Sequence, residues 1–225
     1  MTVLEKMPRP GRKIMITGKG RCNFTNVKDW NGFQQHIYPK ANFLRPSFFN
    51  LTPEGLIGMF AEAGMESVTE RGDRAFPADH RSSTVVDTLV RMASEKGVRI
   101  VCNCNVTGVI RGNSGGCGFI VNCADGSSWK CRRLIITTGG LSYPKTGSTG
   151  DGYAWAEAFG HGLTPRFPSL TALTPANYRF TEWISLKNVQ LTSIIDGNVA
   201  QSEFGDLDFT NGGIEGPLGF RISRK

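Results

Sequence analysis

The chain has no long hydrophobic run, either in its interior or near its start. None of its 225 residues belongs to a segment that approaches the roughly 18 apolar residues of a membrane-spanning helix. The first residues also lack the apolar core of a secretory signal peptide. The sequence therefore predicts a cytoplasmic protein with no membrane partner.

Histidine is scarce, and the cysteines lack the spacing of a metal site. The chain contains 3 histidines and 6 cysteines, and no two cysteines form a Cys-x-x-Cys pair. This pattern argues against both a zinc site and a disulfide framework. We expect no metal site, and we interpret the cysteines as reduced thiols on strands.

Acidic residues are outnumbered, which leaves a net charge of +7. The excess is concentrated at the start, where residues 1–21 carry six cationic side chains and one acid, Glu5. A basic loop that contains glycines favours a small phosphorylated ligand, whereas a basic surface spread over the molecule favours nucleic acid. No nucleic-acid-binding motif is recognisable. We therefore expect a small-molecule substrate and no nucleic acid, and we leave the oligomeric state open.

The pattern of apolar residues predicts both helices and strands in the first part of the chain. One helix is expected from the capping residue Thr52 to Ala63, and a second over Ser82–Lys96. Short strands alternate with turns, which predicts a hairpin, then a strand followed by a β-meander. The expected strands are Thr2–Glu5, Glu66–Glu70, Arg74–Phe76, Val98–Asn103, Asn105–Arg111, Gly118–Cys123 and Ser128–Cys131, with turns at Asn113–Gly116 and Ala124–Gly126.

An apolar run over Arg133–Thr138 is typical of a buried parallel strand. It ends in two glycines, and a helix is expected from about Gly152 to Phe159. After Pro165 the pattern changes to β-rich pieces at Ser185–Ile195 and Val199–Phe209, which suggest a second, all-β unit. We expect a first domain over residues 1–165 and a second over residues 166–225.

The abundant glycine, 28 residues, gathers in loops that also carry polar side chains. In the first loop, over Gly11–Asn26, three glycines, four cations and several amide or hydroxyl side chains stand together. Backbone N–H groups combined with cations suit a diphosphate. A solvated basic turn is the structural alternative.

Two further loops lie around the expected parallel strand and the helix that follows it. Thr137–Gly140 comes at the carboxyl end of the strand, where open α/β sheets bind ligands, although it could also be an ordinary tight turn. Thr146–Gly152 opens the helix, so its glycine amides and hydroxyls could face a polar cofactor edge. Asp151 is placed either to accept from cofactor hydroxyls or to serve simply as the N-cap.

Glu5 stands at the end of the first expected strand, where a carboxylate can bind a ribose. In dinucleotide-binding units, that acid lies about 20 residues beyond a Gly-x-Gly-x-x-Gly loop. Counting back from Glu5 passes the start of the chain. Either Glu5 is an ordinary surface acid, or the chain lacks the first strand, the glycine loop and the first helix.

Taken together, these motifs resemble a known family. The segments that carry the likeness are Val3–Lys6, Gly11–Asn26, Phe76-Pro77 and Thr138–Tyr153. They look like the bacterial NAD(P)/FAD-dependent oxidoreductases of the BaiN/RdsA type, also called aminoacetone-oxidase-like flavoproteins. The Thr-Gly-Gly and Thr-Gly-Asp-Gly turns are also similar to the flavoprotein subunits of fumarate reductases. Phe209–Pro217 is similar to a motif in the family's inserted β-domain.

The resemblance implies an α/β fold: a FAD/NAD(P)-binding Rossmann-like sheet with a β-meander, plus the start of an inserted β-rich domain. It implies hydride transfer from NAD(P)H through FAD to an unsaturated or carbonyl-conjugated small molecule. No catalytic residue is assigned. The residues expected to bind the cofactor are Glu5, Lys6, Arg12, Lys13, Gly18, Gly20, Arg21, Cys22, Asn23, Thr138, Gly139, Gly140, Tyr143, Thr149, Gly150 and Asp151.

The sequence departs from the family pattern at both ends, so we expect an internal fragment or a truncated gene product. The first domain would be incomplete at its N-terminus, and the second at its C-terminus. Two alternatives to a flavin oxidoreductase remain. One is a non-enzymatic remnant with a broken cofactor site, and the other is a basic module that binds nucleic acid.

Overall fold

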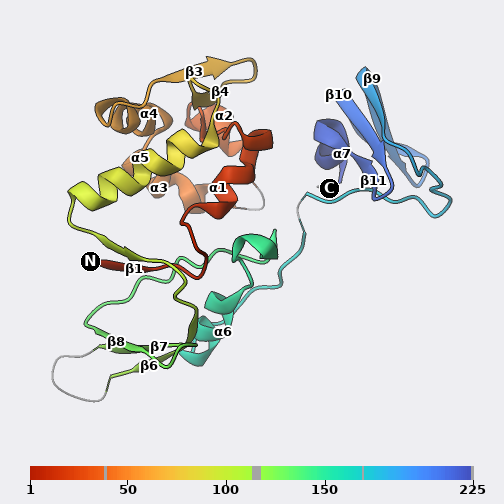
Figure 1. Cartoon of the computed structure of the whole chain (residues 1–225). Coiled ribbons are helices and arrows are strands. Elements are labelled where there is room, and N and C mark those ends of the chain that lie inside the picture. Colours follow the sequence, from red (N-terminus) through yellow and green to blue (C-terminus); the bar gives the residue numbers. More distant parts are fainter. Residues whose placement is uncertain (38–39, 113–117, 169, 224–225) are drawn as a thin grey trace. The chain divides into compact units, whose positions relative to one another are not determined.

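The computed structural model describes residues 1–37, 40–112, 118–168 and 170–223. The chain forms two compact units, Met1–Gly162 and Leu163–Lys225. Figure 1 shows the elements of each unit, which we describe separately. Among the described residues, no helix combines the length and the apolarity needed to cross a membrane.

A parallel pair of strands lies at the centre of the first unit. β1 (Thr2–Leu4) pairs with β5 (Arg99–Val101) in parallel, with Leu4 opposite Val101. Figure 1 shows β1 between the helical layer that contains α1 and α5 and the sheet formed by β6, β7 and β8. Both strands end at the same edge, so the residues after Leu4 are delivered to the carboxyl end of the pair. The predicted strands at both positions are confirmed.

Helices cover one side of this pair. The predicted helix after Thr52 is confirmed: the Thr52 hydroxyl accepts from the backbone N–H of Gly55 at 3.1 Å. The predicted second long helix is also confirmed, and its Val85 and Val86 are buried. The described helical segments of the unit are α1 (Arg12–Ile16), η1 (Thr17–Gly20), α2 (Trp30–Gln34), η2 (Ala41–Leu44), α3 (Arg45–Asn50), α4 (Pro53–Glu62), α5 (Ser82–Glu95), η3 (Pro144–Thr146) and α6 (Asp151–Ala158).

The apolar core of the unit lies between α4, α5 and the loop that follows η1. Phe60, Met65, Val85 and Cys22 are all nearly inaccessible to solvent and pack as one cluster. Phe24 meets Phe60 edge-to-face, with ring centroids 5.2 Å apart. This core therefore holds Cys22 and Phe24, which belong to the predicted cofactor loop, against α4 and α5.

Two antiparallel sheets complete the first unit. β3 (Ser67–Glu70) and β4 (Arg74–Pro77) form the predicted hairpin, and β2 (Thr25–Asn26) pairs with β4. The predicted meander is confirmed as β6 (Val106–Arg111), β7 (Phe119–Cys123) and β8 (Ser128–Cys131). The predicted turn at Asn113–Gly116 lies outside the described residues.

The predicted buried strand over Arg133–Thr138 is wrong. The segment has no strand partner among the described residues, and Ile135 is 76% exposed. An apolar run becomes a buried strand only where neighbouring strands pair with it and side chains cover both faces. β1 has a described partner only in β5, so the pairing that the run requires is missing.

The second unit is β-rich and contains one described helix. β9 (Ile184–Ile195) and β10 (Asn198–Thr210) form a long antiparallel hairpin, and β11 (Gly213–Glu215) pairs with β10. The prediction of an all-β unit missed α7 (Gly216–Ile222), whose Leu218 is fully buried. Pro217 suits the first turn of this helix, because its missing N–H would have no partner there.

Candidate functional site

The loop after β1 is held in place by its own backbone and by β5. The backbone N–H of Glu5 donates to the carbonyl of Val101 at 2.9 Å. The Glu5 carboxylate then turns back and accepts from the backbone N–H of Met7 at 2.8 Å. The carboxylate is therefore fixed at the carboxyl end of the parallel pair, where ligands bind in α/β sheets.

Lys6 joins this loop to the start of α6. Its ammonium group lies 2.5 Å from a carboxylate oxygen of Asp151 and 2.7 Å from the hydroxyl of Thr149. The hydrogen bond from Lys6 is the main cause that lowers the pKa of Asp151, and Thr149 adds to it. Partial burial opposes this effect. Residues more than 140 positions apart thus form one charged cluster.

Gly147 allows the two loops to approach each other. Its φ is +96°, and a Cβ atom placed there would lie 2.9 Å from the Met7 side chain and 4.0 Å from the Glu5 carboxylate. Any larger residue at this position would destabilise the fold, because of the left-handed backbone and because of the contact with Met7. Gly150 also has a positive φ, 84°, and is the N-cap of α6. Of the two roles considered for Asp151, the N-cap role is wrong, because Asp151 is the first residue of the helix.

The Thr138–Gly140 turn packs against the same helix N-terminus. The backbone N–H of Gly152 donates to the Thr138 hydroxyl at 3.2 Å. A Cβ atom on Gly139 would lie 2.7 Å from the hydroxyl oxygen of Ser148, which is buried. Lys13, on α1, reaches this turn and donates to the Ser142 hydroxyl at 3.2 Å. The turn is therefore cationic, hydroxyl-rich and free of bulky side chains at its glycines.

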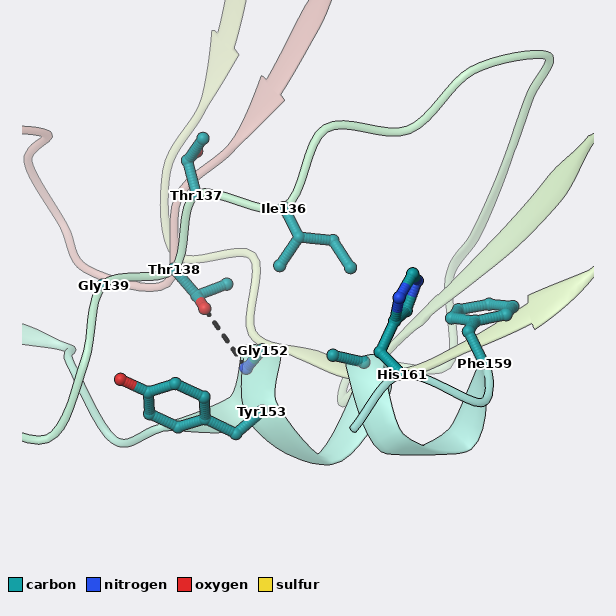
Figure 2. Close-up of a pocket in the computed structure, with 9 residues that line it drawn as sticks. Ile136, Thr137, Thr138, Gly139, Gly152, Tyr153, Phe159 and His161 are labelled. Carbon is teal, nitrogen blue, oxygen red and sulfur yellow. Dashed lines mark hydrogen bonds between the residues drawn. The ribbon is translucent and has the colours of Figure 1, made fainter. Parts of the chain in front are cut away.

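A pocket of about 330 Å³ opens between this turn and α6. Figure 2 shows the Thr138 hydroxyl directed at the N–H of Gly152, and Ile136, Phe159 and His161 at the other end of the pocket. The lining is mainly apolar, with polar groups supplied by the threonines, Tyr153 and His161. Such a combination is typical of a ligand site.

The structure does not bring Arg21 and Cys22 into this cluster. The Arg21 guanidinium makes two hydrogen bonds to the Glu70 carboxylate, at 3.0 and 3.1 Å, and lies over the Phe76 ring. The hydrogen bonds from Arg21 are the main cause that lowers the pKa of Glu70. Cys22 is buried in the apolar core, and this burial raises the pKa of its thiol.

The remaining predicted residues of the first loop also lie apart from the α6 cluster. With its side-chain nitrogen facing Thr25 and Ala75, Asn23 donates to the backbone carbonyl of each. Gly18 packs near the backbone of Asn23, and Gly20 has open space around it. Arg12 is also exposed. Tyr143, which follows the Thr138–Gly140 turn and lies outside the first loop, is 67% exposed with a φ of 52°. The predicted residues that the structure does gather are Glu5, Lys6, Lys13, Thr138, Gly139, Gly140, Thr149, Gly150 and Asp151.

Several residues of this cluster were not among the predicted site residues: Met7, Ser142, Gly147, Ser148 and Gly152. Met7 fills the space beside Gly147, and Ser142 accepts from Lys13. A single sequence gives no signal for Met7, because its role depends on a glycine 140 positions away. Ser142 could have been found, since it lies inside the loop that follows Gly140 and carries a hydroxyl.

Glycine turns at the carboxyl end of a parallel pair, next to a helix N-terminus, are typical of nucleotide-binding α/β proteins. A family model described as "HI0933-like protein Rossmann domain" matches residues 1–217, so the chain belongs to this family. This match confirms both the predicted BaiN/RdsA-type resemblance and the Rossmann-like α/β fold class.

Three curated relatives match almost the whole chain. The chain is 30% identical, over 99% of its length, to a ribosomal RNA dihydrouridine synthase of Haemophilus influenzae. It is 28% identical to a 3-dehydro-bile acid delta(4,6)-reductase of Clostridium scindens, over 99% of its length, and 28% identical to a ribosomal RNA dihydrouridine synthase of Escherichia coli, over 98%. The matches cover 55%, 53% and 54% of these proteins, so the chain spans about half of their length.

Proposed function

We propose that the chain carries the FAD-binding part of an oxidoreductase that transfers hydride from NAD(P)H to a double bond conjugated to a carbonyl group. The observation that carries the proposal is the contact of Lys6 with Thr149 and Asp151. It joins the loop after β1 to the glycine-rich entry of α6. A single site that holds a dinucleotide requires these two segments to lie together. Family membership supports the choice of cofactor.

The residues of the cluster fit such a cofactor. Lys13 offers positive charge, and the N-terminus of α6 offers backbone N–H groups, which together suit a diphosphate. Lys6 is paired with Asp151 and holds the two loops together. The carboxylate of Glu5 is placed to accept hydrogen bonds from ribose hydroxyls. Gly139 and Gly147 let the loops of the cluster pack closely, because a Cβ atom at either position would collide with Ser148 or Met7. Bound FAD supplies the hydride chemistry, and the protein supplies position and charge.

The names of the relatives support the proposed substrate class. Dihydrouridine is uridine with a reduced ring double bond, and that bond is conjugated to a carbonyl group. The name of the bile acid enzyme also describes a reduction, of a compound that carries a 3-oxo group. A conjugated carbonyl group is common to both. For this chain we propose a small-molecule substrate of that kind, and a salt-dependent affinity for uridine-containing RNA would contradict this choice.

FAD titration of the purified chain tests the proposal. We expect the flavin fluorescence to change in a saturable manner, and we expect Lys13→Met to weaken binding about ten-fold, because it removes a charge-assisted hydrogen bond. Lys19→Met is the matched control, because Lys19 is an exposed cation in the adjoining η1. Its affinity should stay within about two-fold of the wild type. Equal effects of the two variants would contradict the site.

A second candidate is a chain that keeps the fold but does not bind the cofactor. The observation that favours it is the unpaired, exposed segment 133–138 beside the predicted cofactor turn, with Ile135 76% exposed. A turn that is not anchored by a paired strand is poorly preorganised for binding. Under this alternative the purified protein is colourless, and added FAD gives no saturable signal at any concentration tested.

A further inference from the structure

Two buried thiols lie in direct contact in the first unit, and neither is among the residues proposed to bind FAD. The sulfur atoms of Cys104 and Cys123 are 3.1 Å apart, and each residue is 6% exposed. Cys104 lies just before β6, and Cys123 is the last residue of β7. Both thiols are free in this structure.

Backbone hydrogen bonds on both sides hold the two cysteines in place. The N–H of Ala124 donates to the carbonyl of Asn105 at 2.8 Å, which ties the residues next to each cysteine together. The N–H of Cys104 donates to the carbonyl of Glu5 at 2.9 Å. The close approach of the sulfurs therefore follows from the pairing of β6 with β7 and from the anchoring of Cys104 to the loop after β1.

We infer that Cys104 and Cys123 form a reversible disulfide when the protein is oxidised, and that this bond joins the end of β7 to the segment before β6, whose backbone is hydrogen-bonded to Glu5. A disulfide has a sulfur–sulfur distance of about 2.05 Å, so the atoms must approach by about 1 Å. Neighbouring antiparallel strands permit a shift of this size through side-chain rotation.

Hydrogen peroxide can serve as the oxidant that converts the two thiols to a disulfide. One thiol is oxidised by hydrogen peroxide to a sulfenic acid, with release of water. The second thiol then attacks that sulfur, the sulfur–sulfur bond forms, and a second water leaves. Two thiols thus lose two protons and two electrons, and the peroxide is reduced to two waters. A dithiol such as dithiothreitol reverses the bond by exchange.

Burial is the main cause that raises the pKa of Cys104 to about 11, and the neighbouring Cys123 adds to it. The thiolate is the reactive form. Oxidation should therefore be slow at neutral pH and faster in mildly alkaline buffer, where more thiolate is present.

The test is peptide mapping after peroxide treatment of the folded chain. Trypsin cleaves after Arg99, Arg111 and Lys130, which places the two cysteines in separate peptides, residues 100–111 and 112–130. Each peptide contains one other cysteine, Cys102 or Cys117, so the variant Cys102→Ser/Cys117→Ser makes the assignment unique. We expect a linked pair of peptides that dithiothreitol separates. Adding Cys123→Ser to this variant should abolish the linked pair.

Two further results decide the matter. The wild-type chain should lose two of its 6 titratable thiols and recover both with dithiothreitol, which tests the inference even if a variant fails to fold. Recovery of both peptides unlinked, or linkage between separate molecules, would overturn it. Neither outcome depends on FAD, so failure here would leave the proposed function unaffected.

Discussion

Single residues decide how close the loops of the candidate site can come. Lys6 could be selected because the segment Val3–Lys6 resembles the family motif. Its partners Asp151 and Thr149 could be selected because they open a glycine-rich helix entry. Arg21 was selected on grounds of charge and loop context, yet the nearby carboxylate of Glu70 holds it elsewhere. A sequence shows which side chains can bind an anion, but not which of them already has an internal partner.

Replacing Gly147 by alanine should separate the loops. The substitution imposes a left-handed backbone on alanine and pushes its Cβ against Met7, which lies 2.9 Å away. We expect a loss of about 1–3 kcal/mol in the free energy of unfolding, measured by urea denaturation. Gly160→Ala is the control, because Gly160 has a similar φ of +86° and nothing within 4 Å of the added atom. Equal losses would show that the contact with Met7 contributes nothing.

Replacing Asp151 by asparagine should lower stability in a pH-dependent way. The pKa of Asp151 is depressed in the folded protein, mainly by Lys6, so the carboxylate stabilises the fold at neutral pH. That stabilisation is lost as the pH falls through the folded-state pKa. We expect the wild type to have the higher Tm at pH 7, and the difference to shrink below about pH 4. A difference that is independent of pH would contradict the role of the charge.

At the scale of elements, local patterns predicted most of the strands and the helices α4, α5 and α6, but they missed the short helices α1, α2, α3 and α7. The α4 helix was recognisable from Thr52, Pro53 and Gly64, which are all local signals. The hairpin β3–β4 and the meander β6–β8 follow from turn residues between short apolar runs. The run over Arg133–Thr138 has the same apolar character as a buried strand but no described partner. Strand formation depends on a neighbour that composition alone does not reveal.

The core between α4 and α5 should be sensitive to truncation. Phe60 is 2% exposed and packs against Cys22, Met65 and Val85. We expect Phe60→Ala to cost about 3–5 kcal/mol in urea unfolding, since it leaves a cavity that the helices cannot close. Phe43→Ala is the control, because Phe43 is 82% exposed and its loss should cost less than about 0.5 kcal/mol. Similar costs would show that this cluster is not the core.

At the scale of the whole molecule, the chain is two compact units, and the second unit begins with a stretch of little regular structure. Residues 161–183 contain no described helix or strand beyond an isolated bridge at Leu173. The second unit could be predicted from the sequence, because after Pro165 the residue pattern changes to prolines followed by β-rich segments. The helix α7 could not be predicted in this way, because the proline and glycines at its start are typical of a turn as well as of a helix N-terminus.

Limited proteolysis tests the division into units. Brief treatment with trypsin should cleave first after Arg166, because the adjoining Phe167 is 82% exposed and the backbone there is irregular. The expected products are two fragments, residues 1–166 and 167–225, which appear together on a mass spectrum. Initial cleavage within the α4–α5 region would show that the first unit is less stable than the junction.

The central claim is that the loop after β1, the Thr138–Gly140 turn and the entry of α6 form one cofactor site. Hydrogen exchange of the chain with and without excess FAD tests it most directly. The account predicts slower exchange, on FAD addition, in peptides that cover residues 5–7, 138–142 and 147–153, and unchanged exchange over residues 198–210 of β10. Protection that falls only on residues 18–23 around Arg21, or on none of the three loops, would contradict it.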